Sequence, residues 1–288
     1  MRVRFEKWEG LGNDFVVLRD LVTMGGTPPY PPGATLDDAT VMRLCDRRRG
    51  IGADGVLLVE TSGSGPPRMI VRNADGSRPE MCGNGLRCVV KHLLDGHPAE
   101  DSLAIETGAG VLDSRVHRRE GTVDEVEVEL GPARLTAPNL PPGPGGGPFR
   151  GVKVEGVDFP GTAVNLGNPH LVLLGAPPEV AREHGPRLEH LPGYPERTNV
   201  EAVRRAQEGL SVWVWERGAG LTDACGTGAG AAVVAAFLAG WVLPDVFVPV
   251  ELPGGRLAVR VAADLGRTTL RGPARFVFGA ELPEALFR

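Results

Sequence analysis

Apolar residues along the chain follow patterns that predict helices of different kinds. The run between residues 86 and 94 has the spacing i, i+3, i+4, i+7, i+8, which predicts a helix with one buried face. Its apolar members are Leu86, Val89, Val90, Leu93 and Leu94. Residues 229–239 are apolar all round apart from Gly230, which predicts a helix buried on every side. A shorter helix is expected to be capped by Asp37 or Asp38 and to end in the basic run at residues 47–49.

Short apolar runs with strand-like alternation surround these helices. The alternation is clearest at Val126, Val128 and Leu130. Strands and helices do not alternate regularly along the chain, so a doubly wound parallel sheet is not expected. The pattern predicts an α+β fold in which each half is rich in strands and has one major central helix. A stretch dense in proline and glycine, residues 138–148, is the best candidate for a surface linker or a long loop.

One short phrase occurs twice, each time just before a predicted major helix. Residues 81–85 read Met-Cys-Gly-Asn-Gly and residues 224–228 read Ala-Cys-Gly-Thr-Gly, about half a chain length apart. A second echo joins residues 11–18, Leu-Gly-Asn-Asp-Phe-Val-Val-Leu, to residues 166–173, Leu-Gly-Asn-Pro-His-Leu-Val-Leu. Because the two echoes keep the same order and a similar separation, we interpret the chain as two homologous halves.

Composition narrows the class of protein. The chain has 288 residues, 42% hydrophobic and 23% charged, and its net charge is −5. These values predict a soluble globular protein and give no reason to expect a nucleic-acid or membrane partner. No apolar run reaches the length needed to cross a bilayer, and the N-terminus has no signal-peptide pattern, so we expect a cytoplasmic protein. Four cysteines in such a chain do not make a disulfide framework.

The repeated phrase places Cys82 and Cys225 at helix N-termini. There the helix dipole favours the thiolate, and a thiol poised near the working pH is suited to acid–base catalysis. The neighbouring glycines expose backbone N–H groups, so each helix start can also hold a carboxylate. Two such helix starts on opposite faces of one small molecule could invert a stereocentre. One thiolate would remove a proton, and the opposite thiol would deliver one.

Other roles for cysteine remain open at this point. A buried cysteine is most often a small core residue, and this is our interpretation of Cys45 and Cys88. Zinc binding by Cys82, Cys88 and His92 lacks the usual ligand spacing, so no metal is expected. A redox disulfide between Cys82 and Cys225 is conceivable, but no Cys-x-x-Cys motif supports it.

A cofactor-dependent racemase is not favoured by the lysines. Pyridoxal phosphate needs a Schiff-base lysine, and none of the three lysines lies beside a convincing phosphate loop: Lys7, Lys91 and Lys153. We therefore expect no cofactor.

The chain resembles the diaminopimelate epimerase family along nearly its whole length. Besides the two cysteine phrases, the resemblance is carried by residues 10–15 (Gly-Leu-Gly-Asn-Asp-Phe), 50–55 (Gly-Ile-Gly-Ala-Asp-Gly), 73–77 (Asn-Ala-Asp-Gly-Ser), 167–170 (Gly-Asn-Pro-His), 198–200 (Thr-Asn-Val), 215–218 (Trp-Glu-Arg-Gly) and 252–255 (Leu-Pro-Gly-Gly). It implies cofactor-independent interconversion of LL- and meso-diaminopimelate, in lysine and peptidoglycan precursor synthesis, with Cys82 and Cys225 as the acid–base pair.

The resemblance also implies an architecture. Two pseudo-symmetric domains are expected, each a curved, barrel-like, mostly antiparallel sheet around a central helix, with the active site in the cleft between them. The N-terminal half would span residues 1–130, with residues 272–288 returning to it, and the C-terminal half residues 131–271. Members of this family are often homodimers, so we expect the same here.

The resemblance assigns further residues to the substrate. The reacting carboxylate is expected on N–H groups near Gly83, Asn84, Gly226 and Thr227. The remaining substrate-binding candidates and one supporting residue are Asn13, Asn73, Asn168, Asn199, Glu216, Arg217 and His170. An amide can donate and accept, and an Arg–carboxylate fork explains selection of a second carboxylate.

Each carried-over residue has an ordinary structural interpretation as well. Asparagines are common in turns, His170 could be a satisfied buried histidine, and residues 216–217 could be a solvated pair. Asp14 and Asp75 are interpreted as turn or capping residues, and the run at 47–49 as a solvated helix end.

The chain departs from the family at three places. Gly55 stands where some relatives have a substrate-contacting glutamine, and Ala202 replaces an aromatic residue. The step Arg78-Pro79 before Glu80 is unusual.

Three alternatives stay open from the sequence. They are a proline or hydroxyproline racemase, a non-catalytic amino-acid-binding protein of the same fold and a phenazine-type isomerase.

Overall fold

The computed structural model of the chain describes residues 2–19, 36–61 and 65–283. It divides into two compact units, which we call unit 1 and unit 2. Unit 1 comprises Met1–Val128 and Pro273–Arg288, and unit 2 comprises Glu129–Gly272. Within the described ranges, no helix has both the length and the apolar character needed to span a membrane.

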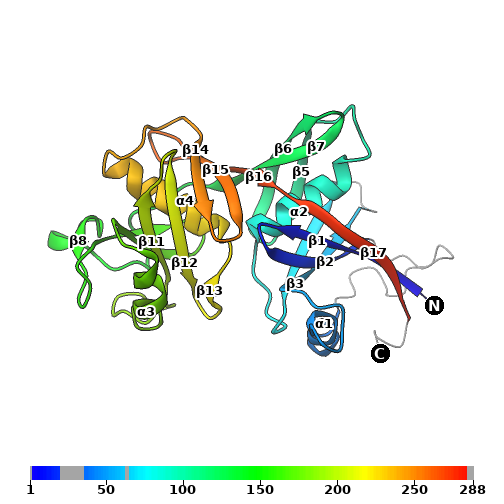
Figure 1. Cartoon of the computed structure of the whole chain (residues 1–288), viewed down its shortest axis with the longest axis horizontal. Helices are drawn as coiled ribbons and strands as arrows, with labels where there is room; N and C mark the ends of the chain where they lie inside the picture. The colour runs from blue at the N-terminus through cyan, green and yellow to red at the C-terminus, as the bar shows by residue number, and fades with distance from the viewer. Residues whose placement is uncertain (1, 20–35, 62–64, 284–288) are drawn as a thin grey trace. The chain divides into compact units, whose positions relative to one another are not determined.

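Unit 1 is a mostly antiparallel sheet against which two helices pack (Figure 1). Its strands are β1 (Arg2–Gly10), β2 (Asn13–Arg19), β3 (Gly55–Glu60), β4 (Arg68–Asn73), β5 (Ser102–Thr107), β6 (Gly110–Arg119), β7 (Thr122–Gly131) and β17 (Arg275–Pro283). Strand β1 pairs antiparallel with both β17 and β2, while β2 and β3 run parallel. Helix α2 (Gly83–Leu94) contacts β1, β2, β3, β4, β6 and β17, and α1 (Asp38–Cys45) packs on β3.

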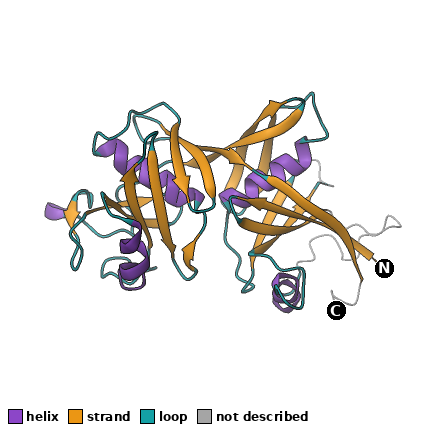
Figure 2. Cartoon of the chain, viewed as in Figure 1, coloured by secondary structure: helices purple, strands orange, loops and turns teal. Residues whose placement is uncertain are grey.

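Unit 2 repeats this arrangement (Figure 2). Its strands are β8 (Val152–Lys153), β9 (Pro160–Asn165), β10 (Pro169–Leu174), β11 (Asn199–Arg205), β12 (Leu210–Glu216), β13 (Gly220–Thr222), β14 (Val248–Leu252), β15 (Gly255–Val261) and β16 (Thr268–Pro273). Helix α4 (Gly226–Leu238) contacts β9, β10, β11, β12 and β15. Helix α3 (Pro178–Leu188) packs on β11, β12 and β13.

The two units share one order of pairings. In unit 1, β1–β2 is antiparallel, β2–β3 parallel and β3–β4 antiparallel, and the cysteine-led helix α2 follows. In unit 2, β9–β10 is antiparallel, β10–β11 parallel and β11–β12 antiparallel, and α4 follows after the short strand β13. The α+β fold with two similar halves is therefore confirmed.

The central helices differ in how they are buried. In α2 every residue from Gly83 to Val90 is buried and only Lys91 and His92 are partly exposed, so the predicted single buried face applies only to its C-terminal turn. In α4 every residue from Gly228 to Ala236 is buried. A Cβ atom at Gly230 would lie 2.7 Å from Leu166 Cδ1, so this glycine lets the helix pack directly against the Leu166 side chain.

One local prediction was wrong, and another, which left two possibilities, is decided in favour of a loop. Helix α1 begins after its cap, Asp37, but ends at Cys45, because the Asp46 carboxylate accepts the N–H groups of Arg48 and Arg49 and starts a separate turn. The basic run at 47–49 is therefore outside the helix. The proline- and glycine-rich stretch at 138–148 is a loop within unit 2 and not a linker between units; it contains the short 3₁₀ turn Pro144–Gly146.

Candidate functional site

Each cysteine of the repeated phrase is the N-cap of its helix. Cys82 precedes α2 with φ −139° and ψ 112°, and Cys225 precedes α4 with φ −123° and ψ 113°. Cys82 Sγ accepts the N–H of Gly85 at 3.5 Å, and Cys225 Sγ accepts the N–H of Gly228 at 3.4 Å. The predicted position of both thiols at helix starts is confirmed, and neither thiol is in a disulfide.

The glycine three residues after each cysteine permits close packing of the first helical turn. A Cβ atom at Gly85 would lie 2.9 Å from Leu57 Cδ2, and one at Gly228 would lie 3.0 Å from Glu201 Oε1. Each helix start therefore sits tightly against a strand of its own unit. Because helix geometry gives the first-turn N–H groups no intrahelical acceptor, the start of each helix suits a carboxylate.

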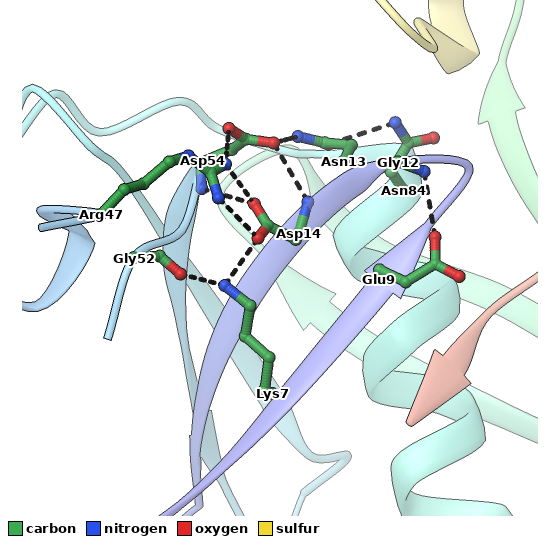
Figure 3. Close-up of polar contacts among 9 residues, drawn as sticks. All are labelled: Lys7, Glu9, Gly12, Asn13, Asp14, Arg47, Gly52, Asp54 and Asn84. Carbon is green, nitrogen blue, oxygen red and sulfur yellow. Dashed lines mark hydrogen bonds and ion pairs between the residues drawn. The ribbon is translucent and has the colours of Figure 1, made fainter. Parts of the chain in front are cut away.

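In unit 1, two predicted substrate residues meet beside the start of α2. Asn13 opens β2, and its Oδ1 accepts the Asn84 amide at 3.2 Å (Figure 3). The Asn13 amide nitrogen donates to Asp54 Oδ2 at 2.8 Å. Asn73 lies at the end of β4, opposite Gly55 in the strand register, and its side-chain amide donates to Ser77 Oγ at 2.9 Å.

A charge cluster lies next to Asn13, and the sequence did not predict it. Asp14 accepts both terminal nitrogens of Arg47, at 3.0 and 2.7 Å, and pairs with Lys7 Nζ at 2.7 Å (Figure 3). Burial alone would raise the pKa of Asp14, but the hydrogen bonds from Arg47 and Lys7 outweigh it and lower this pKa to about 2. Asp14 is therefore a strand residue in an ion-pair cluster and not the turn residue that we expected. The run at 47–49 is exposed as expected, but Arg47 is paired as well.

In unit 2, Cys225 is 5% exposed and its Sγ lies 3.6 Å from Thr227 Oγ1. Close to the first turn of α4 is a fully buried pair, His170 and Glu201. His170 Nδ1 lies 2.7 Å from Glu201 Oε1, and His170 Nε2 lies 2.9 Å from Asn168 Oδ1. Three residues of β10, β11 and the preceding turn are thus joined beneath the helix start.

The predicted residues Glu216 and Arg217 have different partners. Thr222 donates to Glu216 Oε1 at 2.5 Å, whereas Arg217 donates to the Glu196 carbonyl at 2.8 Å. Glu216 and Arg217 therefore each contact another segment of unit 2. The Arg217 N–H donates to Asn199 Oδ1 at 2.8 Å, so Asn199 fixes the backbone on which Arg217 stands.

A buried glutamate supports this turn from the other side. Glu189, 5% exposed, accepts Trp215 Nε1 at 2.8 Å, the Gly218 N–H at 3.0 Å and Arg197 at 2.8 Å. The turn that carries Arg217 is therefore held at both ends.

The electrostatic surroundings of Cys225 favour the protonated thiol. Burial raises the pKa of Cys225 well above its usual value, and the negative charges of Glu216 and Glu201 raise it further. Burial also raises the pKa of Glu201. Cys45 and Cys88 are core residues as expected, and burial raises their pKa values to about 11 and about 12.

Replacing Glu216 by glutamine is expected to speed alkylation of Cys225 at pH 7–8. The change removes a negative neighbour, so the pKa of Cys225 falls. Below the pKa each unit of decrease gives about tenfold more thiolate, so we expect about three- to tenfold faster reaction. Site-resolved mass spectrometry after iodoacetamide treatment measures this rate. Glu208→Gln, at an exposed glutamate paired with Arg256, is the matched control; equal rates in both variants would contradict the stated cause.

Comparison with known proteins decides the family. The family model described as diaminopimelate epimerase matches residues 5–136 and 162–277. The diaminopimelate epimerase of Desulforudis audaxviator is 42% identical over 282 residues, covering 96% of this chain and 98% of its own length. The chain belongs to the diaminopimelate epimerase family. The diaminopimelate epimerase of Desulfitobacterium hafniense is 40% identical and covers 97% of this chain and 98% of its own length.

Solved structures at low sequence identity share the fold. A phenazine biosynthesis protein of the PhzF family from Bacillus anthracis has a TM-score of 0.68 at 15% identity, with 98% of this chain and 99% of that chain covered. A hydroxyproline epimerase from Agrobacterium vitis has a TM-score of 0.66 at 15% identity, with coverage of 98% and 91%. The resemblance read from the motifs is confirmed, as is the assignment to an epimerase family, whose members are isomerases.

Sequence reasoning missed the residues that hold the predicted ones in place. They are Asp54, Arg47, Arg87, Glu201 and Glu189. Glu201 does carry a signal, because it is the charge within the otherwise apolar strand run 200–203. Arg87 carries none, because it lies beside the apolar stripe of α2 and its burial is seen only in the structure. At Gly55 a Cβ atom would lie 2.7 Å from the Arg72 carbonyl, so a glutamine here would require the strands to move apart.

Proposed function

We propose that Cys82 and Cys225 are the two bases by which this member of the diaminopimelate epimerase family interconverts LL- and meso-diaminopimelate. The observation that carries the proposal is the duplicated helix start: in each unit a cysteine caps the central helix, with a glycine three residues later. The proposal requires the two thiols to reach opposite faces of one α-carbon.

The reaction balances with the chain's own groups. One thiolate takes the α-hydrogen as a proton, and the C–H electron pair passes into the carboxylate-stabilised carbanion. The opposite thiol then delivers its proton to the other face and becomes the thiolate. First-turn N–H groups near Gly83, Asn84, Gly226 and Thr227 would hold the carboxylate and stabilise the charge that builds up on it. In the reverse direction the two thiols exchange roles, and no cofactor is needed.

The polar residues of both units supply recognition in this proposal. Glu216 and Arg217 would bind the distal, non-reacting amino-acid centre, because a guanidinium and a carboxylate together match an ammonium and a carboxylate. The four asparagines would contact the substrate's polar groups: Asn13, Asn73, Asn168 and Asn199. His170, held by Glu201, would support Asn168.

Incubation of the purified chain with LL-diaminopimelate, without pyridoxal phosphate, tests the function. We expect meso-diaminopimelate to form and to approach equilibrium with the LL isomer. L-Proline and trans-4-hydroxyproline serve as alternative substrates, and neither should be epimerised. Turnover of a proline substrate but not of diaminopimelate would contradict the proposal and favour a proline-racemase activity; binding of diaminopimelate without turnover would favour a binding protein.

We further propose that the protein is a cytoplasmic homodimer. Within each chain, residues 1–130 together with residues 272–288 form one functional half, and residues 131–271 form the other. Three consecutive residues of β17 have exposed side chains: Phe276 at 53%, Val277 at 51% and Phe278 at 43%. We place the subunit contact at these side chains, because exposed large apolar groups mark many surfaces that contact another chain. Light scattering should give the mass of two chains, and Phe276→Glu should lower it; a monomer at all concentrations would contradict the dimer.

A further inference from the structure

A row of side-chain hydrogen bonds links a buried arginine in α2 to an aspartate before β3. Arg87 Nη2 donates to Asn84 Oδ1 at 3.0 Å, Asn84 Nδ2 donates to Asn13 Oδ1 at 3.2 Å, and Asn13 Nδ2 donates to Asp54 Oδ2 at 2.8 Å. The last two bonds appear in Figure 3. All four residues belong to unit 1.

The hydrogen bonds of this row can run only from Arg87 towards Asp54, because the residue at one end can only donate and the residue at the other end can only accept. A guanidinium can only donate hydrogen bonds, and an ionised carboxylate can only accept them. Arg87 therefore requires the oxygen of the Asn84 amide to face it, and Asp54 requires the nitrogen of the Asn13 amide to face it. Turning Asn13 over would set its oxygen against the Asp54 carboxylate and its NH₂ against the Asn84 NH₂.

Both ends of the row are themselves held in place. Arg87 is fully buried and also donates to the carbonyls of Gly83 and Pro273. The Asp54 carboxylate accepts Arg47 Nη2 at 2.7 Å and the Asp14 N–H at 3.1 Å. The loop before β3 and the first turn of α2 thus act together on the two amides between them.

We propose that Asp54 and Arg87 are positioning residues that fix which way the amides of Asn13 and Asn84 point. This inference rests on the proposed function, in which Asn13 contacts the substrate. Asn13 Oδ1 already accepts one hydrogen bond and Asn13 Nδ2 already donates one. The second lone pair of Oδ1 and the second hydrogen of Nδ2 therefore point in fixed directions. A substrate ammonium or carboxylate therefore meets an acceptor or a donor that does not need to be reoriented on binding.

A double-mutant cycle between Asp54 and Asn13 tests the inference, because Asp54 should act only through Asn13. Asp54→Ala is expected to raise KM for diaminopimelate about tenfold, the usual worth of one fixed polar contact, with kcat changed less than about threefold. Asn13→Ala should do the same, and the double variant should be no worse than Asn13→Ala alone. Asp54→Asn, which keeps an acceptor oxygen, should restore most of the affinity.

A control separates the amide from the surrounding loop. Asp46→Asn changes a carboxylate that accepts the N–H groups of Arg48 and Arg49 and caps the turn at residues 46–49. It should leave KM near the wild-type value. A tenfold rise in KM in Asp46→Asn would overturn the assignment, because loop distortion would then explain the result for Asp54→Ala.

The side-chain amide signals of Asn13 in ¹⁵N-labelled protein give a readout independent of turnover. They are identified by their loss in Asn13→Ala, and they should shift in Asp54→Ala but not in Asp46→Asn. If Asn13→Ala raises KM and Asp54→Ala does not, or if the two effects add fully, the inference fails while the proposed function stands. If Asn13→Ala leaves KM unchanged, the proposed substrate contact itself is wrong, and the inference falls with it.

Discussion

Cys82→Ala and Cys225→Ala should each abolish epimerisation. We expect kcat to fall at least about a thousandfold, because a positioned proton-transfer group raises the rate by about 10²–10⁴. The two thiols have different tasks in each direction of the reaction, so neither can substitute for the other. The two variants should be similarly inactive, and the double variant should be hardly worse than either. The rate of meso-diaminopimelate formation from the LL isomer measures the effect.

The other two cysteines offer a matched control for this experiment. Cys45 is a buried side chain in the core of unit 1, and Cys45→Ala should reduce stability without a comparable loss of kcat. Wild-type turnover by either single variant, Cys82→Ala or Cys225→Ala, would refute the paired-base account. Partial loss in only one variant would indicate a single-base mechanism.

Replacing Arg217 by alanine should lower kcat/KM for diaminopimelate by about two to three orders of magnitude, which is the cost of about 3–4 kcal/mol expected when one partner of a hydrogen-bonded charge pair is removed. The Arg217 backbone is fixed by Asn199, and its side chain is anchored at the Glu196 carbonyl. A distal carboxylate would therefore meet a guanidinium that is already in place.

Arg217→Lys should recover little of this loss, because an ammonium cannot make a two-pronged contact with a carboxylate. Arg197→Ala is the matched control: it removes another arginine near the same turn, one that pairs with Glu189. Initial rates over a range of substrate concentrations give kcat/KM for the wild-type protein and for each of the three variants. A fall in kcat/KM of less than about threefold in Arg217→Ala would show that selection of the second carboxylate lies elsewhere.

The fold and the two thiols could be predicted because their signals are local. A helix with one buried face repeats every three to four residues, and a cysteine followed by glycines marks a helix start within five residues. The two echoes, one at the opening of β2 and β10 and the other at the start of α2 and α4, predicted two homologous halves. The helix and thiol signals depend on neighbouring residues alone.

The supporting contacts could not be predicted because they join distant segments. Asp54 meets Asn13 only after β2 and β3 pair in parallel, and Glu201 meets His170 only after β10 and β11 do. In the sequence Asp54 looks like one more loop carboxylate and Arg47 like one cation in a basic run. Their roles depend on sheet register, which a single sequence does not reveal.

The most direct test of the central claim is the position of deuterium early in the reaction. LL-diaminopimelate is incubated with the wild-type protein in D₂O, and product and residual substrate are analysed by mass spectrometry at low conversion. Two opposed thiols predict meso product carrying one deuterium at the inverted carbon, delivered by the exchanged thiol, while residual substrate retains its hydrogen. Product that keeps the substrate's own α-hydrogen would show one group carrying the proton between faces and would contradict the paired-base account.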